Sequence, residues 1–297
     1  GWTPLNGFVF DLALSVASTV VLLRAMEDRR LLETRRGRIA VGWLIVEDIA
    51  MVLALVMLPV LASTFGPDNG GEPATFGRFA VEIVWTFVKL GAFVAFMLLV
   101  GRRVIPWTLE KIAAPGSREL FALAVLAIAL GVAFGSATLF GVSFALGAFF
   151  AGMLLNESEL SHKAANDSLP LRDAFAVLFF VSVGMLFDPM ILVQQPWAVL
   201  GVLGIVIVGK TVAALVITTA FKLDRKTSLT VAASLAQIGE FSFILAALSM
   251  SLGAMSQETH DLILAAALLS ISLHPFVFKL IDRMGAAPDP QRIARAE

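Results

Sequence analysis

Two adjacent carboxylates, Glu47 and Asp48, lie inside the apolar run GWLIVEDIAMVLALVMLP at residues 42–59. A charge at the centre of a bilayer is costly, so such a residue usually faces a cavity or a partner. Neighbouring helix residues point about 100° apart, so one acid can face a cavity while the other faces another helix. A carboxylate in a cavity can hold either a proton or a bare cation. This competition predicts cation and proton binding at one or both of these acids, Asp48 and Glu47.

Lys210, inside the apolar stretch IVIVGKTVAAL, is the natural partner for the second acid. Intramembrane charges commonly pair with one another. The sequence therefore predicts an ion pair between Lys210 and one of the two acids, which is Glu47 if Asp48 binds the ion. The alternative for both acids is a purely structural ion pair with a lysine.

Two other apolar stretches contain polar residues near their middle. The first, LSVASTVVLL, contains Ser18 and Thr19, and the second, SLAQIGEFSF, contains Gln237, Gly239 and Glu240. Such segments can unwind at membrane depth when they line an aqueous cavity, and transporters use broken helices to hold ions. The alternative for the two hydroxyls is a bond back to the preceding helical turn.

The composition is that of a membrane protein. The chain is 58% hydrophobic and 15% charged, whereas soluble domains are roughly half apolar and a quarter charged. The net charge of −1 argues against nucleic acid as a partner. There is no cysteine, and the only histidines are His162, His260 and His274. We therefore expect no catalytic residue, no enzyme activity and no metal site apart from that of a transported cation.

The apolar segments predict an all-α polytopic membrane protein with about nine spans. The fourth and fifth segments are short and form either two tilted spans or one hairpin. Within the fifth, Gly147 and Gly152 are expected to let helices approach closely. The nine segments are 8–26, 39–62, 79–101, 119–135, 138–155, 174–193, 197–220, 228–252 and 258–281.

Basic residues gather in every second loop, from the five arginines at 29–38 to the tail residues Arg283, Arg292 and Arg295. The opposite loops contain one basic residue, Arg78. Because Lys and Arg concentrate in cytoplasmic loops, this alternation predicts an outside N-terminus and a cytoplasmic C-terminus. The first and eighth spans then run in opposite directions. Two interrupted helices in oppositely oriented units indicate an inverted-repeat transporter.

Several stretches resemble the monovalent cation:proton antiporter-2 family, especially its Kef-type potassium/proton members. LSVASTVVLLRAMEDRRLLETRRGRIAVGWLIVEDIAMV is similar to the central region of that family. GVSFALGAFFAGMLLNESELSHKA, LFFVSVGML and SLAQIGEFSFIL are similar to its other signatures. The resemblance covers nearly the whole chain and is closest to the YbaL-like branch.

The resemblance implies a sodium/proton-antiporter-like inverted-repeat fold, a homodimer in a bacterial inner membrane, and alternating access of an elevator type. Its domains would be a core at 1–62 and 197–284, interface helices at 63–196 and a cytoplasmic linker at 285–297. The site residues that it implies are Asp48 for ion and proton binding, Lys210 as the membrane lysine, Ser18 and Thr19 on the first crossing helix, and Gln237, Gly239 and Glu240 on the second.

The chain departs from the family at two points. Many Kef-type members have Gln where this chain has Glu47, which leaves K⁺ and Na⁺, and the proton count, open. Family members also have further spans before the first one here, and a nucleotide-binding domain after the last. We therefore expect missing material at both ends. We expect no cofactor in this chain, and a nucleotide only on that C-terminal domain.

Two function classes remain. The first is a secondary antiporter that exchanges K⁺ or Na⁺ for protons across the lipid bilayer. The second is a ligand-gated potassium efflux system that conducts without obligatory proton exchange. Against the second class, the chain contains no carbonyl-type filter sequence such as Thr-Val-Gly-Tyr-Gly, since it has no Tyr.

Overall fold

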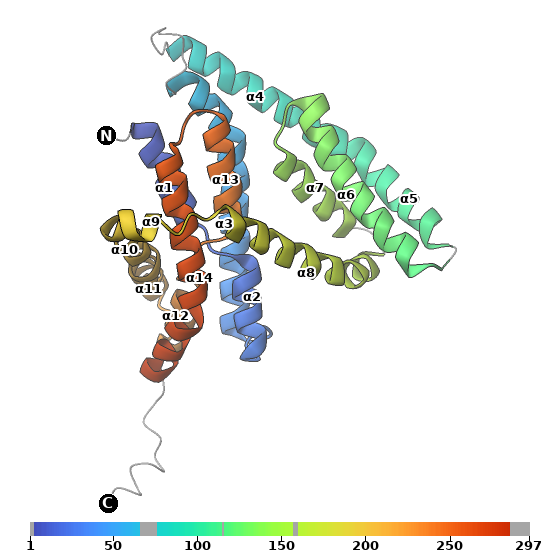
Figure 1. The fold of residues 1–297 in the computed structure, drawn as a ribbon. Helices are drawn as coiled ribbons and strands as arrows, with labels where there is room; N and C mark the ends of the chain where they lie inside the picture. Colours follow the sequence, from blue (N-terminus) through green and yellow to red (C-terminus); the bar gives the residue numbers. More distant parts are fainter. Residues whose placement is uncertain (1–2, 66–75, 115, 157–159, 286–297) are drawn as a thin grey trace, which may run out of the picture. The chain divides into compact units, whose positions relative to one another are not determined.

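The computed structural model describes residues 3–65, 76–114, 116–156 and 160–285. Every regular element in these residues is a helix (Figure 1). The predicted linker at 285–297 falls almost wholly outside the described residues. The chain forms two compact units, residues 1–51 with 183–297 (unit 1) and residues 52–182 (unit 2). The unit boundaries fall within helices α3 (Arg35–Phe65) and α8 (Ser161–Leu186), so each of these helices contributes to both units.

Unit 1 contains both interrupted helices. It also contains the first half of α3 and the last residues of α8. Its other elements are α1 (Pro4–Ser15), α2 (Thr19–Asp28), α9 (Ile191–Gln194), α10 (Pro196–Gly204), the π-helical turn η2 (Ile205–Gly209), α11 (Lys210–Ala220), α12 (Arg225–Leu235), α13 (Glu240–Ser251) and α14 (Gln257–Gly285).

Helices α12 and α13 form the centre of unit 1. Contacts join α12 to α2, α11 and α14, and α13 to α1 and α14. All residues of α12 from Thr227 to Leu235 are buried. The core around α12 includes Leu22, Met26, Leu44 and Phe278. A span that is enclosed by other helices does not need an apolar surface all round, so polar groups are tolerated in it.

Unit 2 contains a long helix followed by a helical hairpin. Its elements, with the second half of α3 and most of α8, are α4 (Phe76–Phe96), the π-helical turn η1 (Met97–Gly101), α5 (Arg102–Ala113), α6 (Arg118–Phe140) and α7 (Phe144–Asn156). Helices α6 and α7 pack against each other. A Cβ atom on Gly147 would collide with Ser136 and with the backbone of Ala133, whereas one on Gly152 would meet nothing within 4 Å. The expected close approach therefore occurs at Gly147 alone.

The number of spans differs slightly from the predicted nine. Eight helical segments of the described residues are long and apolar enough to cross a membrane. The fifth predicted span corresponds to α7, whose 13 residues measure about 20 Å, short of the roughly 30 Å of a bilayer core. The sixth predicted span also begins too late, because α8 already starts at the polar residue Ser161. Hydropathy did not indicate the first turns of α8, because their residues are polar.

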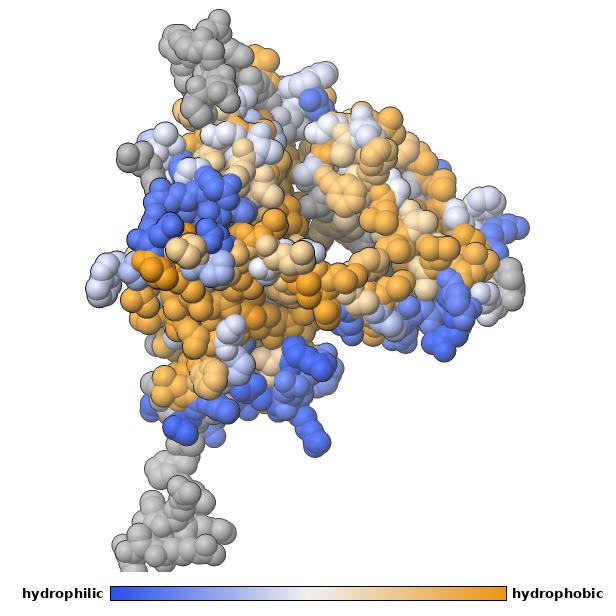
Figure 2. Space-filling view, in the orientation of Figure 1, coloured by the Kyte–Doolittle hydropathy of each residue, from blue (hydrophilic) through white to orange (hydrophobic). Residues whose placement is uncertain are grey.

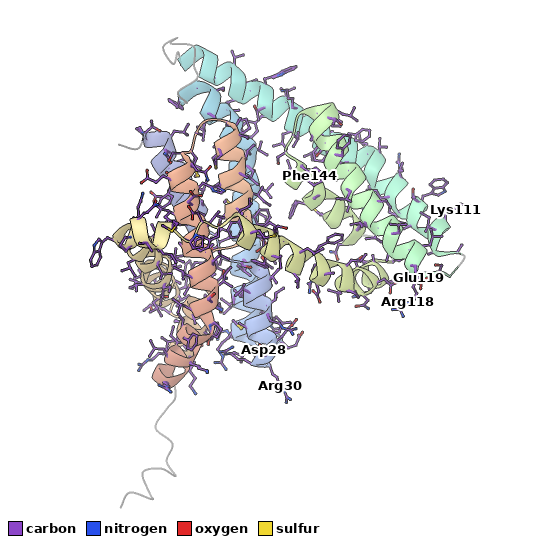
Figure 3. The ribbon with its side chains drawn as sticks, viewed as in Figure 1. Asp28, Arg30, Lys111, Arg118, Glu119 and Phe144 are labelled. Carbon is purple, nitrogen blue, oxygen red and sulfur yellow. The ribbon has the colours of Figure 1, made fainter. Side chains whose placement is uncertain are left out.

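The surface agrees with a lipid environment. In Figure 2, hydrophobic residues cover the middle of unit 1, and hydrophilic residues gather at its lower end and in a patch at its upper left in this view. Figure 3 shows Asp28 and Arg30 at that end, where α2 finishes. In unit 2, Lys111, Arg118 and Glu119 cluster where α5 leads into α6 (Figure 3). The protein is a multi-pass membrane protein.

Candidate ion site at two crossing unwound segments

Both predicted interruptions are real breaks in helices. The first lies between α1 and α2, where Val16 and Ser18 have extended backbones. The second lies between α12 and α13, at residues 236–239. Freed from helical hydrogen bonding, the main-chain groups of these segments need other partners, because lipid offers none.

The two breaks cross and bond directly to each other. The main-chain N–H of Gly239 donates to the Val16 carbonyl at 3.0 Å. The Gln237 side chain bonds both main-chain groups of Ser18: its Oε1 accepts from the Ser18 N–H at 2.9 Å, and its Nε2 donates to the Ser18 carbonyl at 3.1 Å. The Gln237 side chain thus provides hydrogen-bond partners for main-chain groups of Ser18 at the break between α1 and α2. Thr19 starts α2 immediately after this crossing.

Helix α3 brings the two acids to the first break. Glu47 Oε2 accepts from the main-chain N–H of Ala17 at 3.0 Å, and Asp48 Oδ2 accepts from Thr19 Oγ1 at 3.3 Å. Both oxygens of Glu47 are used, because Oε1 accepts from Trp43 Nε1 at 2.8 Å. The two acids therefore have different surroundings, as their 100° separation on the helix predicts.

Asp48 and Glu240 are among the few described residues that have a buried side-chain oxygen without a partner. Asp48 Oδ1 and Glu240 Oε2 are both buried and have no hydrogen-bond partner within the described residues. Both side chains lie at the crossing, since Asp48 accepts from Thr19 and Glu240 follows Gly239 directly in the chain. Two neighbouring carboxylates with free, buried oxygens repel each other unless a proton or a cation lies between or beside them.

Lys210 supports the second break. Its Nζ donates to the main-chain carbonyl of Gln237 at 2.8 Å. The π-helical turn η2 ends immediately before Lys210, and such turns often occur at functional sites. In the described part of the chain, no N–O distance within 4.0 Å joins the Lys210 and Glu47 side chains. Each of these two groups bonds to a break in a helix, and the ion pair between them stays a prediction.

The structure brings the candidate residues together at this crossing, and their roles in ion binding stay a prediction. Sequence reasoning missed three others that support it. Trp43 precedes Glu47 by one helical turn, a spacing that could have indicated it. Ser270 accepts from the Ile238 N–H at 3.3 Å, and His274 Nε2 donates to the Ala233 carbonyl at 3.1 Å. Both lie on α14, far from the breaks in sequence, so no local pattern indicated them.

Nearly the whole chain is similar to a known protein family. The family described as the transmembrane part of sodium/hydrogen exchangers matches residues 1–281. The chain belongs to the sodium/hydrogen exchanger family. The interrupted helices and the acids between them lie entirely within the matched residues.

Three relatives show where the chain sits in this family. It is 59% identical over 283 residues, 95% of this chain and 50% of the relative, to a protein of Escherichia coli (strain K12) named as a proposed cation/proton antiporter, YbaL. It is 34% identical to K(+) efflux antiporter 4 of Arabidopsis thaliana, over 93% of this chain and 45% of the relative. It is 31% identical to the glutathione-regulated potassium-efflux system protein KefC of Salmonella heidelberg (strain SL476), over 93% of this chain and 43% of the relative. The chain spans about half the length of these relatives.

Proposed function

We propose that this chain forms the ion-exchanging part of a secondary antiporter that moves a monovalent cation, K⁺ or Na⁺, against protons. The observation that carries the proposal is the pair of buried, unpartnered oxygens, Asp48 Oδ1 and Glu240 Oε2, beside two unwound segments. Carboxylate oxygens suit hard cations, and the same oxygens accept protons. One group that binds both in turn couples their movement.

The names of the relatives support the same substrates. They describe cation/proton or potassium antiport and potassium efflux. We further propose a bacterial inner membrane as the location, with the C-terminus in the cytoplasm, and a homodimer that uses unit 2 as its interface. Exposed apolar side chains on α4, among them Trp85 and Phe87, support a face that lipid or a second copy covers.

The test is ion exchange in proteoliposomes that contain the full-length protein, with a pH-sensitive dye inside and an imposed K⁺ or Na⁺ gradient. Asp48→Asn should abolish cation-dependent proton movement, because an amide neither ionises nor exchanges a proton. Asp173→Asn is the control, since Asp173 is an exposed carboxylate that forms an ion pair with the adjacent Arg172. Wild-type exchange by the Asp48→Asn protein contradicts the proposal. Cation flux without any proton movement in the wild type favours the efflux-channel alternative.

A further inference from the structure

The main-chain N–H of Ala17 lies in a place where an N–H group is costly. Helix α1 ends at Ser15, so this group has left the helix, and Ala17 is only 1% exposed. At membrane depth, a buried N–H without an acceptor destabilises the fold. Glu47 Oε2 is that acceptor, at 3.0 Å.

The second oxygen of the same carboxylate is held from the other side. Trp43 Nε1, one turn earlier on α3, donates to Glu47 Oε1 at 2.8 Å. We call this set, namely the Trp43 indole, the two Glu47 oxygens and the Ala17 N–H, the Glu47 bridge. It joins α3 to the first break two residues before Thr19, whose hydroxyl donates to Asp48.

We propose that Glu47 is a positioning residue, whose bridge from Trp43 to the Ala17 N–H holds the first unwound segment in place beside Asp48. This inference rests on the proposed function and assigns Glu47 a role within it other than carrying an ion. The carboxylate also lies at the N-terminal end of α2, where the helix dipole favours negative charge.

The bridge explains why a carboxylate suits this position better than an amide when Trp43 is present. A carboxylate accepts hydrogen bonds at both oxygens, whereas a glutamine amide has one oxygen and one NH₂ group. Glu47→Gln therefore places an NH₂ group against either the Trp43 indole N–H or the Ala17 N–H. Removing the indole N–H by Trp43→Phe relieves this conflict, because the amide oxygen can then accept from Ala17 alone. A glutamine is thus compatible with this fold when position 43 lacks a donor.

The experiment is a double-mutant cycle in the full-length protein, with Glu47→Gln, Trp43→Phe and the two combined. Trp197→Phe is the matched control, since Trp197 is 84% exposed. The first measurement is cation-dependent exchange in proteoliposomes, with the apparent KM for the cation and the charge moved per cation. The second is the thermal unfolding midpoint in detergent, which does not depend on transport.

We expect Glu47→Gln to weaken the apparent cation affinity by about tenfold, the effect of one buried donor left unpaired. It should also lower the unfolding midpoint and leave the charge per cation unchanged. The combined variant should recover most of both losses. A changed charge per cation in Glu47→Gln, wild-type behaviour of that variant, or a combined variant no better than it would each overturn the proposal. Absence of exchange in the wild type would overturn the proposed function, and the unfolding cycle would still decide on the bridge.

Discussion

At Gly239 the two unwound segments approach so closely that only a hydrogen fits on the Cα atom. A Cβ atom there would lie 2.5 Å from the Ala17 carbonyl oxygen and 2.9 Å from the Ser18 nitrogen. Both are backbone atoms, which cannot rotate away as a side chain can. The Gly239 N–H also donates to Val16 across the crossing. This glycine is therefore a requirement of packing and is not needed for a left-handed backbone.

Gly239→Ala should separate the two segments and disturb every bond of the crossing. We expect a loss of stability of about 1–3 kcal/mol, as for other overpacked sites, and loss of exchange. Gly7→Ala on α1 is the control, since a Cβ there meets nothing within 4 Å. Denaturant or thermal unfolding in detergent measures the first effect, and proteoliposome flux measures the second. Equal stability of the two variants would show that the crossing is looser than the structure indicates.

Among the elements, α12 is held at both ends by side chains. Asp224 caps its start, accepting from the Thr227 N–H at 3.0 Å and from the Thr227 hydroxyl at 2.7 Å. At its end, the Ala233 carbonyl accepts from His274 and the Gln237 carbonyl from Lys210. A helix that stops in mid-membrane leaves carbonyl groups without partners, and positively charged or donor groups stabilise that end. Lys210 thus has a structural role whether or not it takes part in exchange.

The cap of α12 should make stability depend on pH. The hydroxyl and the N–H of Thr227 lower the pKa of the Asp224 carboxyl below its ordinary value. Because the folded-state pKa is lower than the unfolded one, the cap stabilises above about pH 4. This contribution is lost as the pH falls through the folded-state pKa.

Asp224→Ala should therefore lower the unfolding midpoint at pH 7, and the gap to the wild type should narrow as the pH falls from 5 to 3. Asp224→Ser is the control, because serine caps a helix without a titrating charge. Thermal unfolding in detergent across this pH range measures both. A gap that stays constant down to pH 3 would contradict a role for the ionised carboxylate.

For the whole molecule, the distribution of charge predicts how the chain lies in the membrane. The segment after α2 is rich in arginine, and the segment between α8 and α10 contains no Lys or Arg. These two segments should lie on opposite sides of the bilayer.

The chain contains no cysteine, so single cysteines can report this directly. We expect a membrane-impermeant thiol reagent added outside intact cells to label Gln194→Cys and not Glu33→Cys. Both side chains are exposed in the structure. Permeabilised cells provide the control, since both variants should then react. Labelling of Glu33→Cys in intact cells would reverse the predicted orientation.

Much of this architecture was predictable because lipid imposes simple rules. Long apolar runs indicated the spans, and the polar residues in LSVASTVVLL and SLAQIGEFSF indicated both breaks. The predicted bounds differ from the structure where these signals weaken. Helix α7 is apolar and has only 13 residues, and the first turns of α8 are polar although helical. The division into core and interface domains remains a prediction; the two compact units have boundaries at 51/52 and 182/183.

By itself, the sequence determined that the chain spans a membrane, where its helices break, and which acids lie at membrane depth, because hydropathy and charge are local properties. Only the tertiary structure decided which group each charge bonds to. Glu47 and Lys210 are complementary in charge and at similar depth, so pairing was the simplest expectation. In the fold, each bonds to a main-chain group freed by a helix break, Ala17 N–H and Gln237 C=O. Those groups need partners only because α1 and α12 end there, and their neighbours come from helices distant in sequence.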